Sequence, residues 1–322
     1  MSAQQTGPHP HRRTALKGGI LATAVAASAM IPVPASAAEH PGRHDPLVHR
    51  PVPEQLPVTE GHVDVVGGQL YYWDTGGEEP AVVLAHAGTG SALAWPYQQP
   101  VLARAGYRVI SYSRRGHYRS SAATADDPPA VHDLLALTEH LNVPAFHLVG
   151  AALGGFLAVD FAVSHPSKLR SLVLVNSQLG IQEADYEEAL ARIRPPEFED
   201  LPHSFRELGA PYRAVAPEGV HAWERTTELS RPGPANPRPR LIHTMTWKLL
   251  ATISTRTLMT VGDADLYMPP PLGRTVAAHL PNVSLLTFSE AGHAPQWERP
   301  SDFNRQLLRF LSGARFPADS RC

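Results

Sequence analysis

Short apolar runs recur along most of the chain and alternate with stretches in which apolar residues return at helical spacing. The predominantly apolar runs are 81–85, 107–112, 146–149, 169–175, 256–261 and 283–288. Runs of this length are typical of strands buried on both faces, as in a parallel sheet. Helical spacing is found at 95–105, 131–141 and 302–311. The pattern therefore predicts an α/β fold with a mainly parallel sheet flanked by helices.

Two segments depart from this alternation. Gly67-Gly68 stands between two strand-like stretches, which predicts a β-hairpin near the start of the domain. Residues 178–250 instead hold charged helical stretches, such as 184–193, and proline-containing loops. We therefore expect a helical cap over 178–250, inserted into an α/β core that is formed by 61–177 and 251–315.

The composition excludes several classes of function. The 322 residues are 43% hydrophobic, enough for one large α/β domain or two small domains, and the formal net charge is −2. We find no basic patch that would bind nucleic acid. The only cysteine is Cys322, which rules out an intrachain disulfide and a cysteine metal cluster. Because the sequence has neither a metal-binding histidine motif nor a phosphate-binding glycine loop, we expect no metal and no cofactor.

The N-terminal segment carries the features of an export signal. Arg12-Arg13 precedes a weakly apolar run at 18–31, and Ala35-Ser36-Ala37 fits a signal-peptidase site. This arrangement resembles a twin-arginine signal, and the run is too short and too weakly apolar to span a membrane. We expect residues 1–37 to be removed on export to the periplasm or beyond the cell. Residues 38–60, rich in Pro and His, are expected to form a linker, with no membrane contact after cleavage.

The central feature of the sequence is the segment 146–155, which has the pattern of a buried strand, a sharp turn and a helix opened by glycines. Its turn has the form Gly150-x-Ala152-x-Gly154. In a nucleophile elbow the same frame is G-x-S-x-G, and the serine attacks the substrate carbonyl. Alanine has no nucleophilic atom, so no acyl-enzyme can form at this position.

Four landmarks in a fixed order identify the family that this chain resembles. They are the loop His86-Ala87-Gly88 after a strand, the turn Arg115-Gly116-His117, the elbow, and the pair Asp265 and Gly292-His293 after the last two strands. Residues 63–311 therefore resemble an α/β-hydrolase of the capped, esterase- and haloperoxidase-like kind. In that family the nucleophile, the acid and the base occur in this order along the chain.

The resemblance implies a role for each catalytic position. His293 would be the general base, and Asp265 would hold its imidazole in the required tautomer. Asp263 is the competing acid, although the family's spacing from the preceding glycine favours Asp265. The backbone N–H groups of Ala87 and Leu153 would form the oxyanion hole. Three further residues are candidates for substrate binding, although each could instead serve packing: His86, Tyr118 and Trp247.

The chain departs from the family pattern at four positions. Ala152 replaces the nucleophilic serine, and Ala87 replaces the usual second glycine of the oxyanion loop. Ser113 stands where the family commonly has Asp, and Tyr118 stands where it has Gly. An engineered Ser-to-Ala change would explain Ala152 alone, whereas natural divergence of the site explains all four.

The sequence therefore predicts an exported enzyme with a small-molecule substrate that is partly apolar and of the ester or carbonyl type. His293 and Asp265 would act as a dyad with a backbone oxyanion hole, in a hydrolytic or lyase-like reaction without a serine acyl-enzyme. Three alternatives stay open. The chain could be an inactivated carboxylic-ester hydrolase or a non-catalytic ligand-binding protein, or its nucleophile could have moved to Ser91, Ser113 or Ser177. The sequence does not define the oligomeric state.

Overall fold

The computed structural model describes residues 47–322 except 79, 232–237, 315 and 317–318. The predicted signal, 1–37, and the first part of the predicted linker, 38–46, lie outside the described residues. So does the stretch 232–237 within the predicted cap. In the part of the chain that is described, no helix combines the length and the apolar character needed to cross a membrane.

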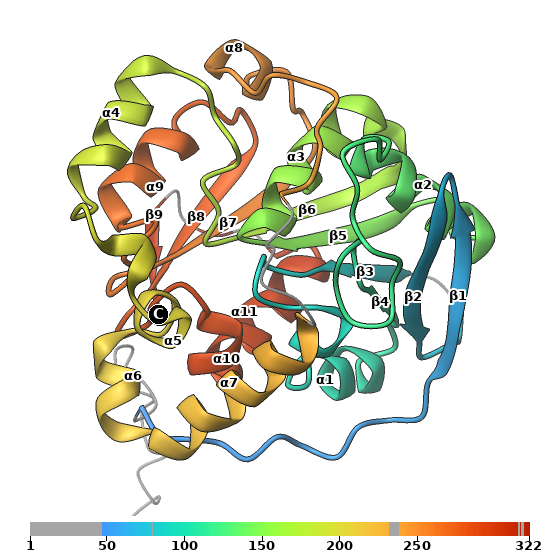
Figure 1. Cartoon of the computed structure of the whole chain (residues 1–322), viewed down its shortest axis with the longest axis horizontal. Coiled ribbons are helices and arrows are strands. Elements are labelled where there is room, and N and C mark those ends of the chain that lie inside the picture. The colour runs from blue at the N-terminus through green and yellow to red at the C-terminus, as the bar shows by residue number, and fades with distance from the viewer. Residues whose placement is uncertain (1–46, 79, 232–237, 315, 317–318) are drawn as a thin grey trace, which may run out of the picture. The chain divides into compact units, whose positions relative to one another are not determined.

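A nine-stranded sheet forms the centre of the molecule, with the strand order β1-β2-β4-β3-β5-β6-β7-β8-β9 (Figure 1). The strands are β1 Thr59–Val65, β2 Gly68–Asp74, β3 Ala81–Ala85, β4 Arg108–Tyr112, β5 Phe146–Ala151, β6 Leu169–Val175, β7 Thr257–Gly262, β8 Val283–Phe288 and β9 Asp319–Arg321. β1 pairs with β2, and β2 with β4, in antiparallel fashion, and every other neighbouring pair is parallel. The predicted hairpin and mainly parallel sheet are confirmed, whereas β9 was not predicted.

Helices cover both faces of the sheet because the side chains of each buried strand alternate between two apolar clusters. The flanking helices are α1 Gln99–Arg104, α2 Ala130–His140, α3 Leu153–Ser164, α9 Pro270–Ala277, α10 Pro295–Glu298 and α11 Pro300–Leu311, with short 3₁₀ turns at Ala92–Ala94, Pro166–Lys168 and Phe198–Asp200. α2, α3 and α9 pack on one face, and α1 and α11 on the other (Figure 1). This is the architecture that the apolar pattern predicts.

Among the described residues between β6 and β7, five α-helices are found. They are α4 Ala184–Arg192, α5 His203–Glu207, α6 Ala210–Val215, α7 Pro217–Ser230 and α8 Trp247–Leu250. A third apolar cluster joins this segment to the rest of the fold, with Leu208, Tyr212 and Trp223 packed against Tyr97 and Trp297. The described part of 178–250 contains helices joined by loops, consistent with the predicted helical character. Its status as a separate cap domain stays a prediction.

The residues before β1 are held against the domain by specific contacts. Leu47 packs on the third apolar cluster. The hydroxyl of Tyr97 donates to the carbonyl of Arg50 at 2.5 Å. Leu56 and the side chain of Gln99 exchange two hydrogen bonds, of 3.0 and 2.7 Å. The later part of the predicted linker, 47–58, is therefore docked, and β1 begins at Thr59, inside the boundary predicted at residue 60.

Candidate active site

The turn between β5 and α3 has the strained geometry of an elbow. Ala152 has φ 47° and ψ −112°, a combination that is uncommon for a residue with a Cβ. Its backbone is fixed on both sides, because its N–H donates to the carbonyl of Val175 at 3.0 Å and its carbonyl accepts from the Ser177 hydroxyl at 2.7 Å. The elbow is thus present in full, but it presents a methyl group where a hydrolase presents a nucleophile.

Two glycines allow the helix after the elbow to approach the sheet closely. A Cβ on Gly150 would lie 2.5 Å from the carbonyl oxygen of Gly154, and one on Gly154 would lie 2.2 Å from that of Ala85. Only glycine fits at such distances. The first turn of α3 therefore lies directly against the end of β3, where the predicted oxyanion loop begins.

The loops after β7 and β8 bring Asp265 and His293 together. His293 Nδ1 lies 2.9 Å from Asp265 Oδ2 and 3.0 Å from Oδ1. Because a carboxylate only accepts hydrogen bonds, Nδ1 carries the proton and Nε2 is the basic nitrogen. Asp263 instead accepts from the backbone N–H of Glu290 at 2.7 Å, so the structure pairs His293 with Asp265 and not with Asp263.

Three donors fix the carboxylate of Asp265. The backbone N–H groups of Tyr267 and Met268 donate to Oδ1 at 2.7 and 3.1 Å. Asn176, which follows β6, donates to Oδ2 at 3.0 Å, and its own side-chain carbonyl accepts from Thr260 at 2.9 Å. Asn176 is a supporting residue that the sequence analysis missed, because a single Asn after a strand carries no distinctive signal.

The charges around His293 favour its protonated form. Burial alone would lower the pKa of His293. The charge and hydrogen bond of Asp265, with smaller contributions from Glu207 and Glu298, outweigh burial and raise this pKa above its usual value. An imidazole held in this way can accept a proton and stabilise the resulting charge.

The base and the elbow line one cavity of about 300 Å³. Ala152, Leu153, Ala87 and His293 all contribute to its wall, so the structure brings the predicted nucleophile position, oxyanion residues and base together. The rest of the wall is more polar than the sequence suggests: Gly88, Phe156, Gln178, Arg194, Glu199, His203, Arg206, Glu207, Arg238 and Tyr267.

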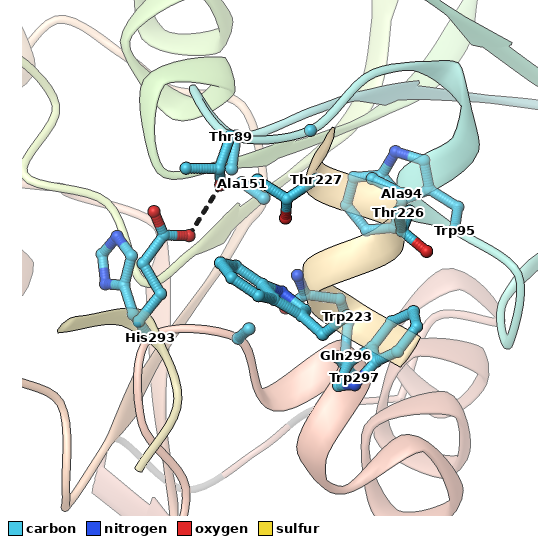
Figure 2. A pocket seen from close by; sticks show the side chains of 14 residues that line it. Thr89, Ala94, Trp95, Ala151, Trp223, Thr226, Thr227, His293, Gln296 and Trp297 are labelled. Carbon is cyan, nitrogen blue, oxygen red and sulfur yellow. Dashed lines mark hydrogen bonds between the residues drawn. The ribbon is translucent and has the colours of Figure 1, made fainter. Parts of the chain in front are cut away.

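A smaller cavity of about 30 Å³ adjoins this site and is walled by tryptophans (Figure 2). Trp95, Trp223 and Trp297 line it, and His293 lies at its other end. Ala87, Glu207 and His293 line both cavities. The apolar surface of the smaller cavity and the charged surface of the larger one therefore meet at His293.

None of the three residues predicted to bind substrate lines either cavity, and their part in substrate binding stays a prediction. His86 is fully buried, its Nε2 accepts from the backbone N–H of Arg114 at 3.0 Å, and burial lowers its pKa well below the usual value. Tyr118 packs edge-on against Tyr71, and Trp247 stacks on His279 with ring centroids 4.0 Å apart. Each of the three side chains is used in packing or in holding a loop.

The serines considered as displaced nucleophiles are buried and engaged elsewhere. Ser91 shares a hydrogen bond of 2.8 Å with Ser230, and Ser113 accepts from the backbone N–H of Ala92 at 3.1 Å. Ser177 donates to the carbonyl of Ala152. Within the described ranges, none of the three hydroxyls forms a hydrogen bond with His293.

A second buried carboxylate ties the inserted helices to the loop that carries the base. Glu298 is 1% exposed. It accepts from the backbone N–H groups of Gly209 at 2.8 Å, Gly292 at 2.9 Å and Ala294 at 3.2 Å. Burial raises the pKa of Glu298 to about 7, although these three donors favour the charged form.

Stability should therefore fall as pH rises through neutrality. The folded chain binds the Glu298 proton up to about pH 7, whereas an ordinary Glu has lost it near pH 4.5. Between these values the folded state binds more protons, so its stability decreases with pH, by about 3 kcal/mol in total. Urea unfolding from pH 5 to pH 8 should show this loss in the parent and a much smaller one in Glu298→Gln. The exposed Glu188→Gln should behave as the parent, and equal slopes in all three proteins would contradict the assignment.

Comparison with known proteins identifies relatives of the whole domain. Residues 80–216 match the family model described as alpha/beta hydrolase fold. A Variovorax paradoxus protein named "Putative carbamate hydrolase RutD" is 30% identical over 262 residues, which cover 74% of this chain and 93% of that protein. The 2-hydroxy-6-oxononadienedioate/2-hydroxy-6-oxononatrienedioate hydrolase of Burkholderia vietnamiensis is 28% identical over 79% of this chain and 96% of its own length.

A solved structure shows the same fold. The crystal structure of the enol-lactonase from Burkholderia xenovorans superposes with a TM-score of 0.66 at 22% identity, covering 78% of this chain and 100% of the other. Because the Variovorax paradoxus relative is 30% identical over 93% of its length, the protein belongs to the α/β-hydrolase fold family. The two relatives in sequence are named as hydrolases of small organic molecules.

Proposed function

We propose that the protein is an enzyme that hydrolyses a small, partly apolar ester or carbonyl compound without a serine acyl-enzyme. The observation that supports this most directly is that His293, held by Asp265, and the strained alanine elbow line one cavity. A base, an acid partner and an elbow are thus retained around a position that lacks a nucleophile. The names of the relatives suggest carbamates and oxo-dienoates as further substrates to test.

In the proposed reaction the substrate carbonyl lies against the backbone N–H groups of Ala87 and Leu153. His293 Nε2 takes a proton from a water molecule, and the resulting hydroxide adds to the carbonyl carbon. The two N–H groups stabilise the oxyanion, and Asp265 stabilises the imidazolium. In a serine hydrolase that has lost a triad member, only about 10³–10⁴-fold acceleration over water remains. We therefore expect an activated substrate.

Two other functions are compatible with the family. An ester hydrolase inactivated by a Ser-to-Ala change would have the same elbow and dyad. A ligand-binding protein would keep the cavity without using His293 as a base. The buried His293–Asp265 pair favours catalysis over binding, because a pocket that only binds has no requirement for an oriented base.

Replacing Ala152 distinguishes the three. The parent, Ala152→Ser and His293→Ala would be assayed on 4-nitrophenyl esters, a carbamate and an oxo-dienoate. We expect turnover by the parent, and its loss in His293→Ala. An inactive parent combined with an acyl burst from Ala152→Ser would instead identify an inactivated ester hydrolase. Ligand binding without turnover in all three proteins would identify a binding protein.

We also propose export through the twin-arginine route, on the basis of Arg12-Arg13 and Ala35-Ser36-Ala37. Expression in a bacterial host should yield an exported form that begins at Ala38. Replacing Arg12 and Arg13 with Lys should retain the uncleaved chain inside the cell. An N-terminal sequence that starts at residue 1 in the exported fraction would contradict the proposal.

A further inference from the structure

A carboxylate from the inserted helices faces the base, and none of the proposed steps uses it. Glu207 is the last residue of α5, and its side chain lines both cavities together with His293. Its residue is 8% exposed, so the carboxyl group is largely removed from bulk water yet borders the space that a substrate would occupy. A buried acid at such a place requires a partner or a function.

The position of Glu207 is fixed from two sides. Its backbone carbonyl accepts from the N–H of His293 at 2.7 Å, so a direct hydrogen bond joins the backbones of the two residues. Its Oε2 accepts from the hydroxyl of Thr89, in the oxyanion loop, at 2.8 Å, the bond drawn beside His293 in Figure 2. Oε1 lies 3.8 Å from His203 Nδ1, beyond hydrogen-bond distance.

The surroundings of Glu207 set its protonation. Burial raises its pKa above the usual value. The charges of His293, Arg206 and Arg231 and the hydrogen bond from Thr89 each oppose that rise without cancelling it. A carboxyl group that keeps its proton at higher pH than usual can give that proton to a substrate.

We propose that Glu207 is a second catalytic residue, the general acid that protonates the leaving group while His293 acts as the base. The inference rests on the proposed function. It adds the protonation of the leaving group, for which the proposed function names no residue. In a serine hydrolase one histidine takes a proton and later returns it to the leaving group. Here the two tasks are divided between two groups that line the same cavity.

The step is balanced in atoms and charge. Water gives one proton to His293 Nε2, and its oxygen forms a bond with the carbonyl carbon. The bond from that carbon to the leaving oxygen or nitrogen breaks as this atom takes the proton from Glu207 Oε1. The products are a carboxylic acid and an alcohol or amine. The proton on His293 then returns to the Glu207 carboxylate through a water molecule, which restores both groups.

A leaving-group comparison tests the assignment. Glu207→Gln keeps the side-chain shape and can still accept from Thr89, but it has no proton to give. With benzyl acetate, whose alkoxide leaves poorly, kcat should fall roughly 100-fold or more. With 4-nitrophenyl acetate, whose leaving group needs no proton, kcat should change by less than about threefold. The alkaline limb of the pH profile for benzyl acetate should also disappear.

A matched control and a second variant complete the test. Glu228→Gln removes the same charge from the exposed side of α7 and should leave both rates as in the parent. Thr89→Val removes a hydrogen bond that lowers the pKa of Glu207, so the alkaline limb for benzyl acetate should move to higher pH. An equal loss on both esters in Glu207→Gln, with the alkaline limb unchanged, would overturn the role of Glu207 alone. Turnover of neither ester by the parent would overturn the proposed function as well.

Discussion

Replacing His293 with alanine is expected to lower kcat/KM by about 10²–10⁴-fold, the usual contribution of a positioned general base. Among the described residues, His203 is the other histidine that lines this cavity, and its Nδ1 lies 3.8 Å from Glu207 Oε1. His86 is fully buried and accepts from the backbone N–H of Arg114. Asp265→Asn should have a smaller effect of the same kind, because an amide can stabilise the wrong tautomer of the imidazole. Initial rates on 4-nitrophenyl and benzyl esters measure both effects.

Two observations would show that the loss comes from the missing base. His221→Ala, on the exposed side of α7, should retain the parent rate. Free imidazole added to His293→Ala should restore part of the activity, because it can enter the space that the side chain leaves. If His293→Ala kept the parent kcat/KM, the histidine would have no part in the chemistry, and the proposed function would fail.

Replacing Gly154 with alanine is expected to destabilise the fold by about 3 kcal/mol, near the upper end for an overpacked site. The added Cβ would lie 2.2 Å from the carbonyl oxygen of Ala85 and 2.7 Å from that of His86. Both contacts are with backbone, which cannot turn aside as a flexible side chain can. The first turn of α3 would have to move away from β3, and the N–H of Leu153 would move with it.

Gly76→Ala is the matched control for this loss of stability. Gly76 has φ +68°, and an added Cβ there would meet nothing within 4 Å. It should therefore show only the cost of a left-handed backbone, about 1 kcal/mol. Urea unfolding of the two variants separates steric overlap from backbone strain. A Gly154→Ala protein no less stable than Gly76→Ala would mean that α3 can move without cost.

The sequence predicts those parts of the fold and site that depend on local pattern. Continuous apolar runs identify the parallel strands, because a strand buried on both faces has no solvent-facing position that would favour a polar residue. The elbow and the pair Asp265 and His293 each stand at a short, fixed distance after a strand, so chain order alone places them at one edge of the sheet. For this reason the structure brings the elbow and His293 to one cavity, with Asp265 hydrogen-bonded to His293 behind it.

The rest of the site depends on how the inserted helices pack. The periodic pattern of apolar residues does not predict this packing. Glu207 stands in a charged helical stretch where any of several acids could have faced the cavity. Asn176 reaches Asp265 only because neighbouring strands end side by side. Three residues were candidates for substrate binding because of their type or their position in a motif. In the structure their side chains make packing contacts or hydrogen bonds elsewhere: His86, Tyr118 and Trp247.

Cleavage of the docked segment before β1 is expected to weaken the packing that supports Glu207. Leu47 packs in the same apolar cluster as Leu208, which is the residue next to Glu207. A protease that cuts between Arg50 and Leu56 would release Leu47 and loosen the support of that cluster, while β1 and the sheet stayed intact. Proteolytic removal of the N-terminal segment is therefore expected to reduce activity before the sheet unfolds.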